Sequence, residues 1–83
     1  MSEVERLTQI ILEDYRQELK LLLNWQNGDH TKMLALFAHI KEVEEELLQH
    51  VGTRDEVIRI GNDCYNAALK ELMPYLWGWL RKG

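Results

Sequence analysis

The stretch Gly52-Thr53-Arg54-Asp55-Glu56 carries the signals that end one helix and begin another. Glycine readily adopts the left-handed backbone conformation that closes many helices. Thr53, with Glu56 three residues later, matches the capping box, in which each side chain accepts a hydrogen bond from the other residue's backbone N–H. Asp55 and Glu56 also place negative charge where the helix dipole favours it. We therefore expect a tight junction between two helices at Gly52.

A similar break lies upstream, where Gly28 suits the end of a helix and Asp29 suits the N-cap of the next. Between the breaks, apolar residues recur every three or four positions, which is typical of helices. In the middle segment this stripe consists of Met33, Leu36, Phe37, Ile40, Val43, Leu47 and Val51. The two breaks predict helices over about 3–27, 30–51 and 54–73.

Pro74 interrupts the pattern, because proline removes a helical hydrogen bond and crowds the preceding turn. We expect either a kink there or a separate short helix over residues 74–81. Short connections place consecutive helices antiparallel. The prediction is one all-α domain over residues 1–83, an up-down-up three-helix bundle with a short kinked or separate C-terminal extension after Pro74.

Composition excludes several classes of protein. The chain has 83 residues, 46% of them hydrophobic, and a formal net charge of −4, which argues against nucleic-acid binding. One cysteine excludes an internal disulfide framework and suits a cytoplasmic protein. No apolar run is long enough to span a membrane. Phosphate-binding glycine loops, metalloprotease motifs and nucleophile elbows are also missing from the sequence, so we expect neither an enzyme nor a cofactor.

The first segment is apolar on more than one face, and Asp14 and Glu18 lie on one of its apolar seams. A helix of this kind needs more cover than two partner helices offer, and the C-terminal aromatic residues add further apolar surface, so we expect a homodimer. Three roles are open to the two acids: the water-exposed edge of the seam, a buried contact that fixes the register of a dimer, or a metal-binding or catalytic pair. The buried role would need a base such as Arg54 or Arg59.

Small residues in the third segment mark a face that another helix could approach closely. Gly61, Cys64 and Ala68 share this face. The approaching helix can belong to the same chain or to a second copy. Gly61 and Ala68 are candidates for a contact between two copies. Cys64 lies on the apolar stripe, where a buried inert thiol is expected.

The middle segment carries the densest negative charge, in Glu42, Glu44, Glu45 and Glu46. This cluster can be a solvated face, a divalent-cation site or a contact for a basic protein; for the last role the candidates are Glu42, Glu45 and Glu46. His39 and His50 lie near these acids on the same helix, and they are weak candidates for metal ligands.

The acidic helix also resembles part of a known enzyme family. The stretches Lys41–Glu45, 54–58 and 61–63 are similar to the all-α nucleotide pyrophosphohydrolases of the MazG and dUTPase type. That family holds Mg²⁺ with a Glu-Glu-x-x-Glu helix and a Glu-x-x-Asp helix. Glu42, Glu45 and Asp63 match three of the five ligand positions, whereas Lys41 and Ile60 occupy the other two. The resemblance covers about 25 residues and implies a diverged Mg²⁺-dependent hydrolase as an alternative function.

The C-terminal stretch 75–83 is rich in aromatic residues and ends in two bases and a glycine. Trp and Tyr frequently dominate protein-binding surfaces. The stretch can cover the open end of the bundle, contact another protein or lie on a membrane surface, although it is short for the last role. The aromatic candidates for protein binding are Tyr75, Trp77, Trp79 and, in the first segment, Trp25.

Taken together, these features predict a small non-enzymatic regulator, adaptor or inhibitor that binds another protein and forms a homodimer. Two alternatives remain: the diverged pyrophosphohydrolase, and a metal-binding bundle that uses His39 and His50.

Overall fold

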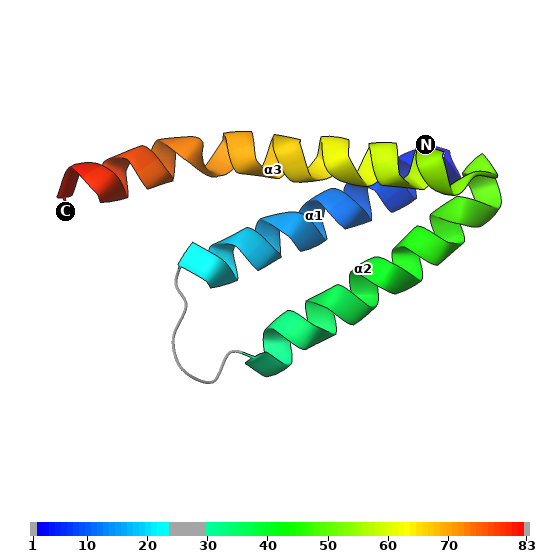
Figure 1. Ribbon diagram of the computed structural model, residues 1–83, viewed down its shortest axis with the longest axis horizontal. Helices are drawn as coiled ribbons and strands as arrows, with labels where there is room; N and C mark the ends of the chain where they lie inside the picture. Colours follow the sequence, from blue (N-terminus) through cyan, green and yellow to red (C-terminus); the bar gives the residue numbers. More distant parts are fainter. Residues whose placement is uncertain (1, 24–29, 83) are drawn as a thin grey trace.

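The polypeptide folds into three α-helices in up-down-up order, which confirms the predicted all-α bundle (Figure 1). The computed structural model describes residues 2–23 and 30–82, with side chains as far as residue 75. Within these residues there is no strand, and the helices are α1 (Glu3–Leu23), α2 (His30–Val51) and α3 (Arg54–Lys82). The predicted break at Gly28 and the predicted end of the first helix near residue 27 lie outside the described residues.

Helix α1 lies between the other two helices and packs against both, whereas α2 and α3 touch each other much less (Figure 1). The N-terminus of α1 lies near the junction of α2 and α3, which we call the closed end of the bundle. From there α2 and α3 diverge toward the open end. The two apolar faces of α1 are therefore used within one chain, one on each neighbouring helix.

The junction at the closed end has the geometry predicted from its sequence. Gly52 has a φ of 89°, and its N–H donates to the Leu48 carbonyl at 2.8 Å. The Glu56 N–H donates to the Thr53 hydroxyl at 3.4 Å, as a capping box requires. The Glu56 carboxylate instead pairs with Arg59 one turn later. These contacts end α2 and start α3 within two residues.

The core has two parts along α1. The larger lies toward the closed end and joins all three helices through Leu7, Ile11, Val43, Leu47, Val57, Ile60 and Cys64. The smaller joins only α1 and α3, through Leu19, Ala68 and Leu72. Ala68 is fully buried, so this small residue lets α1 and α3 approach each other within the chain. Burial raises the pKa of the Cys64 thiol, with a smaller effect from Asp63, and the thiol contacts the Thr8 carbonyl at 3.6 Å.

Helix α3 continues through Pro74 to Lys82, so the predicted end at residue 73 is too early and the extension is the last part of α3. Proline removes only its own N–H from the helical ladder, and the turns on either side sustain the helix. Figure 1 shows this last part extending past the end of α1. Among the described helices, none is both long and apolar enough to cross a membrane.

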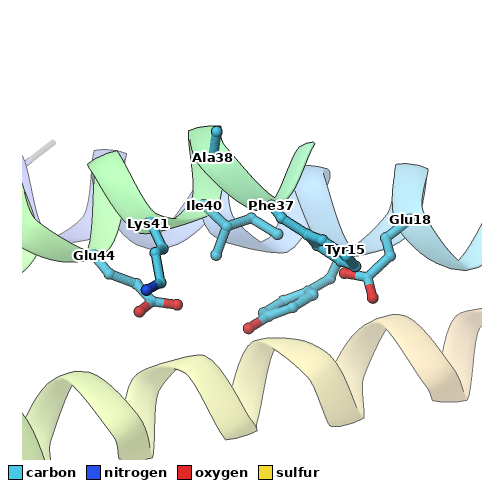
Figure 2. Close-up of a pocket in the computed structure, with 7 residues that line it drawn as sticks. All are labelled: Tyr15, Glu18, Phe37, Ala38, Ile40, Lys41 and Glu44. Carbon is cyan, nitrogen blue, oxygen red and sulfur yellow. The ribbon is translucent and has the colours of Figure 1, made fainter. Parts of the chain in front are cut away.

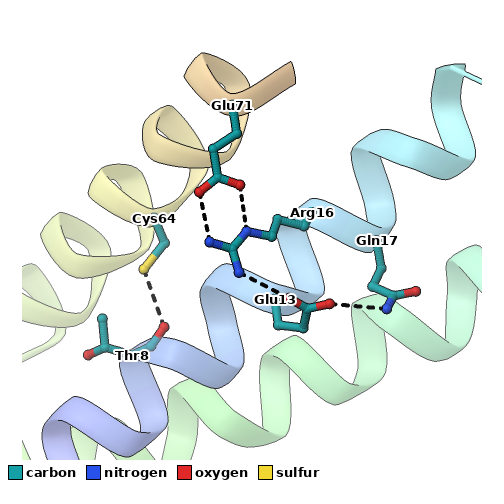
Figure 3. A network of polar contacts seen from close by, with 6 residues as sticks. All are labelled: Thr8, Glu13, Arg16, Gln17, Cys64 and Glu71. Atoms are coloured by element: carbon teal, nitrogen blue, oxygen red, sulfur yellow. Dashed lines mark hydrogen bonds and ion pairs between the residues drawn. The ribbon is translucent and has the colours of Figure 1, made fainter. Parts of the chain in front are cut away.

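A polar network on the surface links α1 to α3 beside the smaller core (Figure 3). Arg16 donates from Nε and Nη2 to the two carboxylate oxygens of Glu71, at 2.6 and 2.7 Å. Its Nη1 donates to Glu13 at 3.1 Å, and Gln17 donates to the other oxygen of Glu13 at 3.3 Å. A two-point contact between guanidinium and carboxylate fixes orientation more firmly than a single hydrogen bond.

Substitutions of Gly52 and Gly61 by alanine should have opposite effects on stability. At Gly52 an alanine would be forced into the left-handed region, so Gly52→Ala should destabilise the fold by about 1 kcal/mol. At Gly61 a Cβ would meet only the Tyr15 hydroxyl, at an ordinary 3.9 Å, inside a regular helix. Gly61→Ala should therefore stabilise the fold by about 0.5 kcal/mol. Urea unfolding of dilute protein, followed by circular dichroism, measures both changes in the free energy of unfolding. Two changes of the same sign would contradict the different backbone roles given to the two glycines.

The contact between Arg16 and Glu71 predicts that the stability of the fold depends on pH. Hydrogen bonds from Arg16 hold the pKa of Glu71 below its ordinary value of 4.5. A carboxyl group of this kind stabilises the folded chain above its unfolded pKa, and the contribution is lost as the pH falls through the lower folded pKa. Glu71→Gln should therefore lower stability at neutral pH and make it fall less steeply below about pH 4.5. Urea unfolding midpoints of the wild type and Glu71→Gln, measured across this pH range, test the prediction. An equal dependence of stability on pH in the two proteins would contradict it.

Candidate functional site

An apolar groove runs between α2 and α3 over the middle of α1 (Figure 2). Its volume is about 510 Å³. The walls come from α1 and α2, namely Tyr15, Glu18, Phe37, Ala38, Ile40, Lys41 and Glu44. A smaller hollow of about 150 Å³ shares Tyr15 and Glu44 and carries the groove on to Val57, Ile58, Gly61 and Asn62 of α3. The two hollows adjoin at Tyr15 and Glu44 and together extend from α2 to α3.

Tyr15 forms the floor of this groove. Its hydroxyl lies beside Gly61, where an added Cβ would be at an ordinary contact distance of 3.9 Å. Its ring meets the edge of Tyr65 with centroids 5.4 Å apart and planes at 79°, a favourable geometry for an aromatic pair. Burial, followed by the charges of Glu44 and Glu18, raises the pKa of the Tyr15 phenol. The bulk of Tyr15 thus stands between α2 and α3 where they diverge.

Large apolar side chains remain exposed along both walls. Phe37 on α2 is 47% exposed and Ile58 on α3 is 56% exposed. Tyr65, 37% exposed, contacts the Tyr15 ring but is not among the residues that line the hollows. Isolated apolar side chains on a surface are ordinary, but a row of them beside a hollow indicates a surface that gains from being covered.

The polar groups of the groove are two carboxylates and one ammonium: Glu18, Glu44 and Lys41. Glu18, predicted as a seam residue, is half-buried here, and burial raises its pKa. The groove therefore combines apolar walls with a weakly acidic rim. This combination suits a helix that is apolar on one face and basic at one end.

Asp14, the other predicted seam residue, is buried at 8% exposure. Of the roles left open for Asp14, the water-exposed edge is wrong for this residue, and the group beside it is His39 of α2, whose Nδ1 lies 2.5 Å from Asp14 Oδ2. The two arginines proposed as partners pair elsewhere, Arg54 with Glu45 and Arg59 with Glu56 and Asp63. The contact between Asp14 and His39 lies within one chain, where it ties α1 to α2.

The acidic cluster of α2 is exposed, and two of its members have cations of the same chain beside them. Glu45 lies 3.4 Å from Arg54, and Glu46 lies 4.0 Å from Arg6. Glu42 lines a small polar hollow between α1 and α2, together with His39. His50, the second histidine proposed as a metal ligand, is exposed at the end of α2. Among the described residues, no three His, Cys, Asp or Glu side chains converge as a metal site would require.

The acids that resemble the pyrophosphohydrolase motifs do not form one cluster in this part of the chain. Glu45 pairs with Arg54, and Asp63 pairs with Arg59 at 3.1 Å on the outer face of α3. Both ion pairs are exposed to solvent. The geometry that would clamp Mg²⁺ between two acidic helices is therefore not assembled by these residues.

The aromatic candidates near the C-terminus lie on the part of α3 that extends past α1. Tyr75 is 72% exposed, so at this position the stretch does not cover the core of its own chain. For Trp77 and Trp79 the structure describes only the helical backbone, and Trp25 lies outside the described residues.

No family model, curated protein or solved structure matches this chain. The groove must therefore be interpreted from its own residues. The sequence pattern places Phe37 on the apolar stripe of α2 and indicates no special role for Tyr15 or Tyr65. The available signal was the pairing of a bulky Tyr15 with Gly61, which helical periodicity alone does not reveal.

The contact between Asp14 and His39 predicts that removing either side chain destabilises the fold, but by different amounts. His39→Ala leaves a buried carboxylate without its partner and should cost about 1–3 kcal/mol. Asp14→Ala leaves a histidine that is half exposed and can bind water instead, so it should cost less. The double variant should be more stable than His39→Ala alone. Urea unfolding of the three variants measures this cycle, and additive losses would show that the two side chains are not coupled.

Proposed function

We propose that this protein is a non-enzymatic protein-interaction module that receives an amphipathic helix in the groove between α2 and α3. The observation that carries the proposal is that two large exposed apolar side chains, Phe37 on α2 and Ile58 on α3, line the two adjoining hollows. Grooves of this kind bind the apolar face of a helix through side chains spaced three or four residues apart.

The packing of the bundle supports the same proposal. Helix α1 is covered by α2 and α3, but within residues 2–23 and 30–82 no further helix covers the face of Tyr15 between them. An incoming helix would bury Phe37 and Ile58, and each apolar side chain removed from water contributes roughly 1.5–3 kcal/mol when burial is complete. Such a module would act as a regulator, adaptor or inhibitor. We place it in the cytoplasm, because its one cysteine is a free thiol.

Capture of partners from the source cell tests the proposal with two matched variants. Phe37→Glu puts a carboxylate into the groove beside Glu18 and Glu44, whereas Leu34→Glu changes an equally apolar residue, 65% exposed, that does not line the groove. Proteins retained by the wild type and by Leu34→Glu should be reduced at least about tenfold on Phe37→Glu, a difference of roughly 1.4 kcal/mol. Equal retention by all three would contradict a functional groove.

A further inference from the structure

Four residues share the groove side of α2, namely Phe37, Lys41, Glu44 and Leu48, and we call them the α2 stripe. Their spacings of four, three and four residues place them along one face of the helix. Figure 2 shows the first three projecting from α2 into the space between it and α3. Phe37 is 47% exposed, and Leu48 lies half-buried against the larger core. The stripe is therefore apolar at both ends and charged at its centre.

The two charges at the centre of the stripe have no ion-pair partner among the described side chains. By contrast, every arginine whose side chain the structure describes pairs within the chain: Arg6, Arg16, Arg54 and Arg59. Lys41 and Glu44 thus stand beside an apolar hollow as a cation and an anion. A complementary occupant of the groove offers an acid to Lys41 and a base to Glu44.

We infer that this occupant is a second copy of the chain, whose α2 lies along the groove antiparallel to α2 of the first, so that the protein is a homodimer. The inference rests on the proposed function and names the helix that the groove receives. In a two-fold contact, each pairing of one residue with another occurs twice, once in each direction. Lys41 then meets the second copy's Glu44, and Glu44 meets the second copy's Lys41.

The charges also decide the direction of the second helix. Alternating spacings of three and four residues let two helices pack along a shared stripe, as in coiled coils. In a parallel pair in register, Lys41 would face Lys41 and Glu44 would face Glu44, and like charges in contact oppose association. In an antiparallel pair centred between these residues, each charge faces its opposite and Phe37 faces the second copy's Leu48. A polar pair at the centre of such a contact fixes its register.

The same placement covers apolar surface on α3. Ile58 is 56% exposed and shares a hollow with Glu44, so a helix that meets Glu44 also lies beside Ile58. Glu18, the third charged group of the groove, lies on α1 nearer the open end than Tyr15. Because Glu18 is partly exposed there, the contact requires no further cation for it.

Charge reversal on α2 tests the arrangement in the full-length chain. By light scattering after gel filtration, the wild type should have twice the 9.9 kDa mass of one chain. Lys41→Glu puts two acids opposite each other across the contact, and Glu44→Lys puts two bases there. Each reversal occurs twice in a dimer, so either variant should weaken dimerisation at least about tenfold. Circular dichroism establishes that each variant remains helical.

Two recombinations should restore the dimer, because each returns every charge to an opposite one. The first is the double variant Lys41→Glu/Glu44→Lys, which exchanges the pair within one chain. The second is an equimolar mixture of the two single variants, one of them isotopically labelled, in which one copy supplies two acids and the other two bases. Native mass spectrometry of this mixture should find mainly the mixed dimer.

Phe37→Glu and Met73→Glu form a matched pair of apolar substitutions. Phe37 is 47% exposed on the α2 stripe, whereas Met73 is 44% exposed on α3 and lines neither hollow of the groove. Phe37→Glu should weaken dimerisation at least about tenfold, since it puts a carboxylate against the second copy's Leu48. Met73→Glu should keep the mass of two chains.

Three results would overturn the inference: a wild type that is monomeric at about millimolar concentration, single charge variants that dimerise as tightly as the wild type, or failure of both recombinations. A monomeric wild type whose captured partners are still lost on Phe37→Glu would overturn the dimer alone and leave the proposed groove function standing. A dimer that responds to charge reversal as expected, with other captured proteins retained equally by Phe37→Glu, would support the contact between copies and overturn the function as a receptor for other proteins.

Discussion

Helix α1 packs on two neighbours at once, and the rest of the bundle depends on that double contact. Leu7 and Ile11 are almost completely buried because α2 covers one side of them and α3 the other. Since α2 and α3 share little contact of their own, each is placed mainly by its contact with α1. Polar groups reinforce each side separately, His39 with Asp14 toward α2 and Glu71 with Arg16 toward α3. The angle between α2 and α3 is consequently set by the side chains of α1 that stand between them.

Tyr15 is the side chain that matters most for this angle. Its hydroxyl lies beside Gly61 and its ring packs against Tyr65, so the side chain fills the point where the two outer helices begin to separate. A smaller residue would leave a cavity, and the outer helices would gain by closing over it. The groove is therefore a product of packing, since the same aromatic side chain that supports the core also keeps the groove open.

Much of the fold could be predicted from the sequence, because its signals are local. The glycine at position 52, with Thr53 and Glu56 after it, determines a helix junction within a few residues, and the structure shows that junction. The effect of Pro74 is harder to predict, because the loss of one N–H must be weighed against the many helical hydrogen bonds that remain. In the structure these bonds prevail, and α3 continues through Pro74.

The groove and the buried pair could not be predicted in the same way. Periodicity assigns Asp14 and His39 to faces of two separate helices, 25 residues apart, but it does not fix how those helices are rotated toward each other. Likewise, nothing local indicates that Phe37 lines an opening, because its exposure depends on how far α2 leans away from α3.

The thin contact between α2 and α3 also divides the molecule dynamically. Helices α1 and α3 share a core of their own in Leu19, Ala68 and Leu72, in which α2 takes no part. Helix α2 joins the larger core through Val43 and Leu47, buries Met33 and Ile40 nearer its N-terminus, and is linked to α1 through His39. Local opening follows the weakest set of contacts, so α2 should exchange its amide hydrogens before the pair formed by α1 and α3. In such an opening α1 and α3 stay together, and Gly52 is the point about which α2 moves.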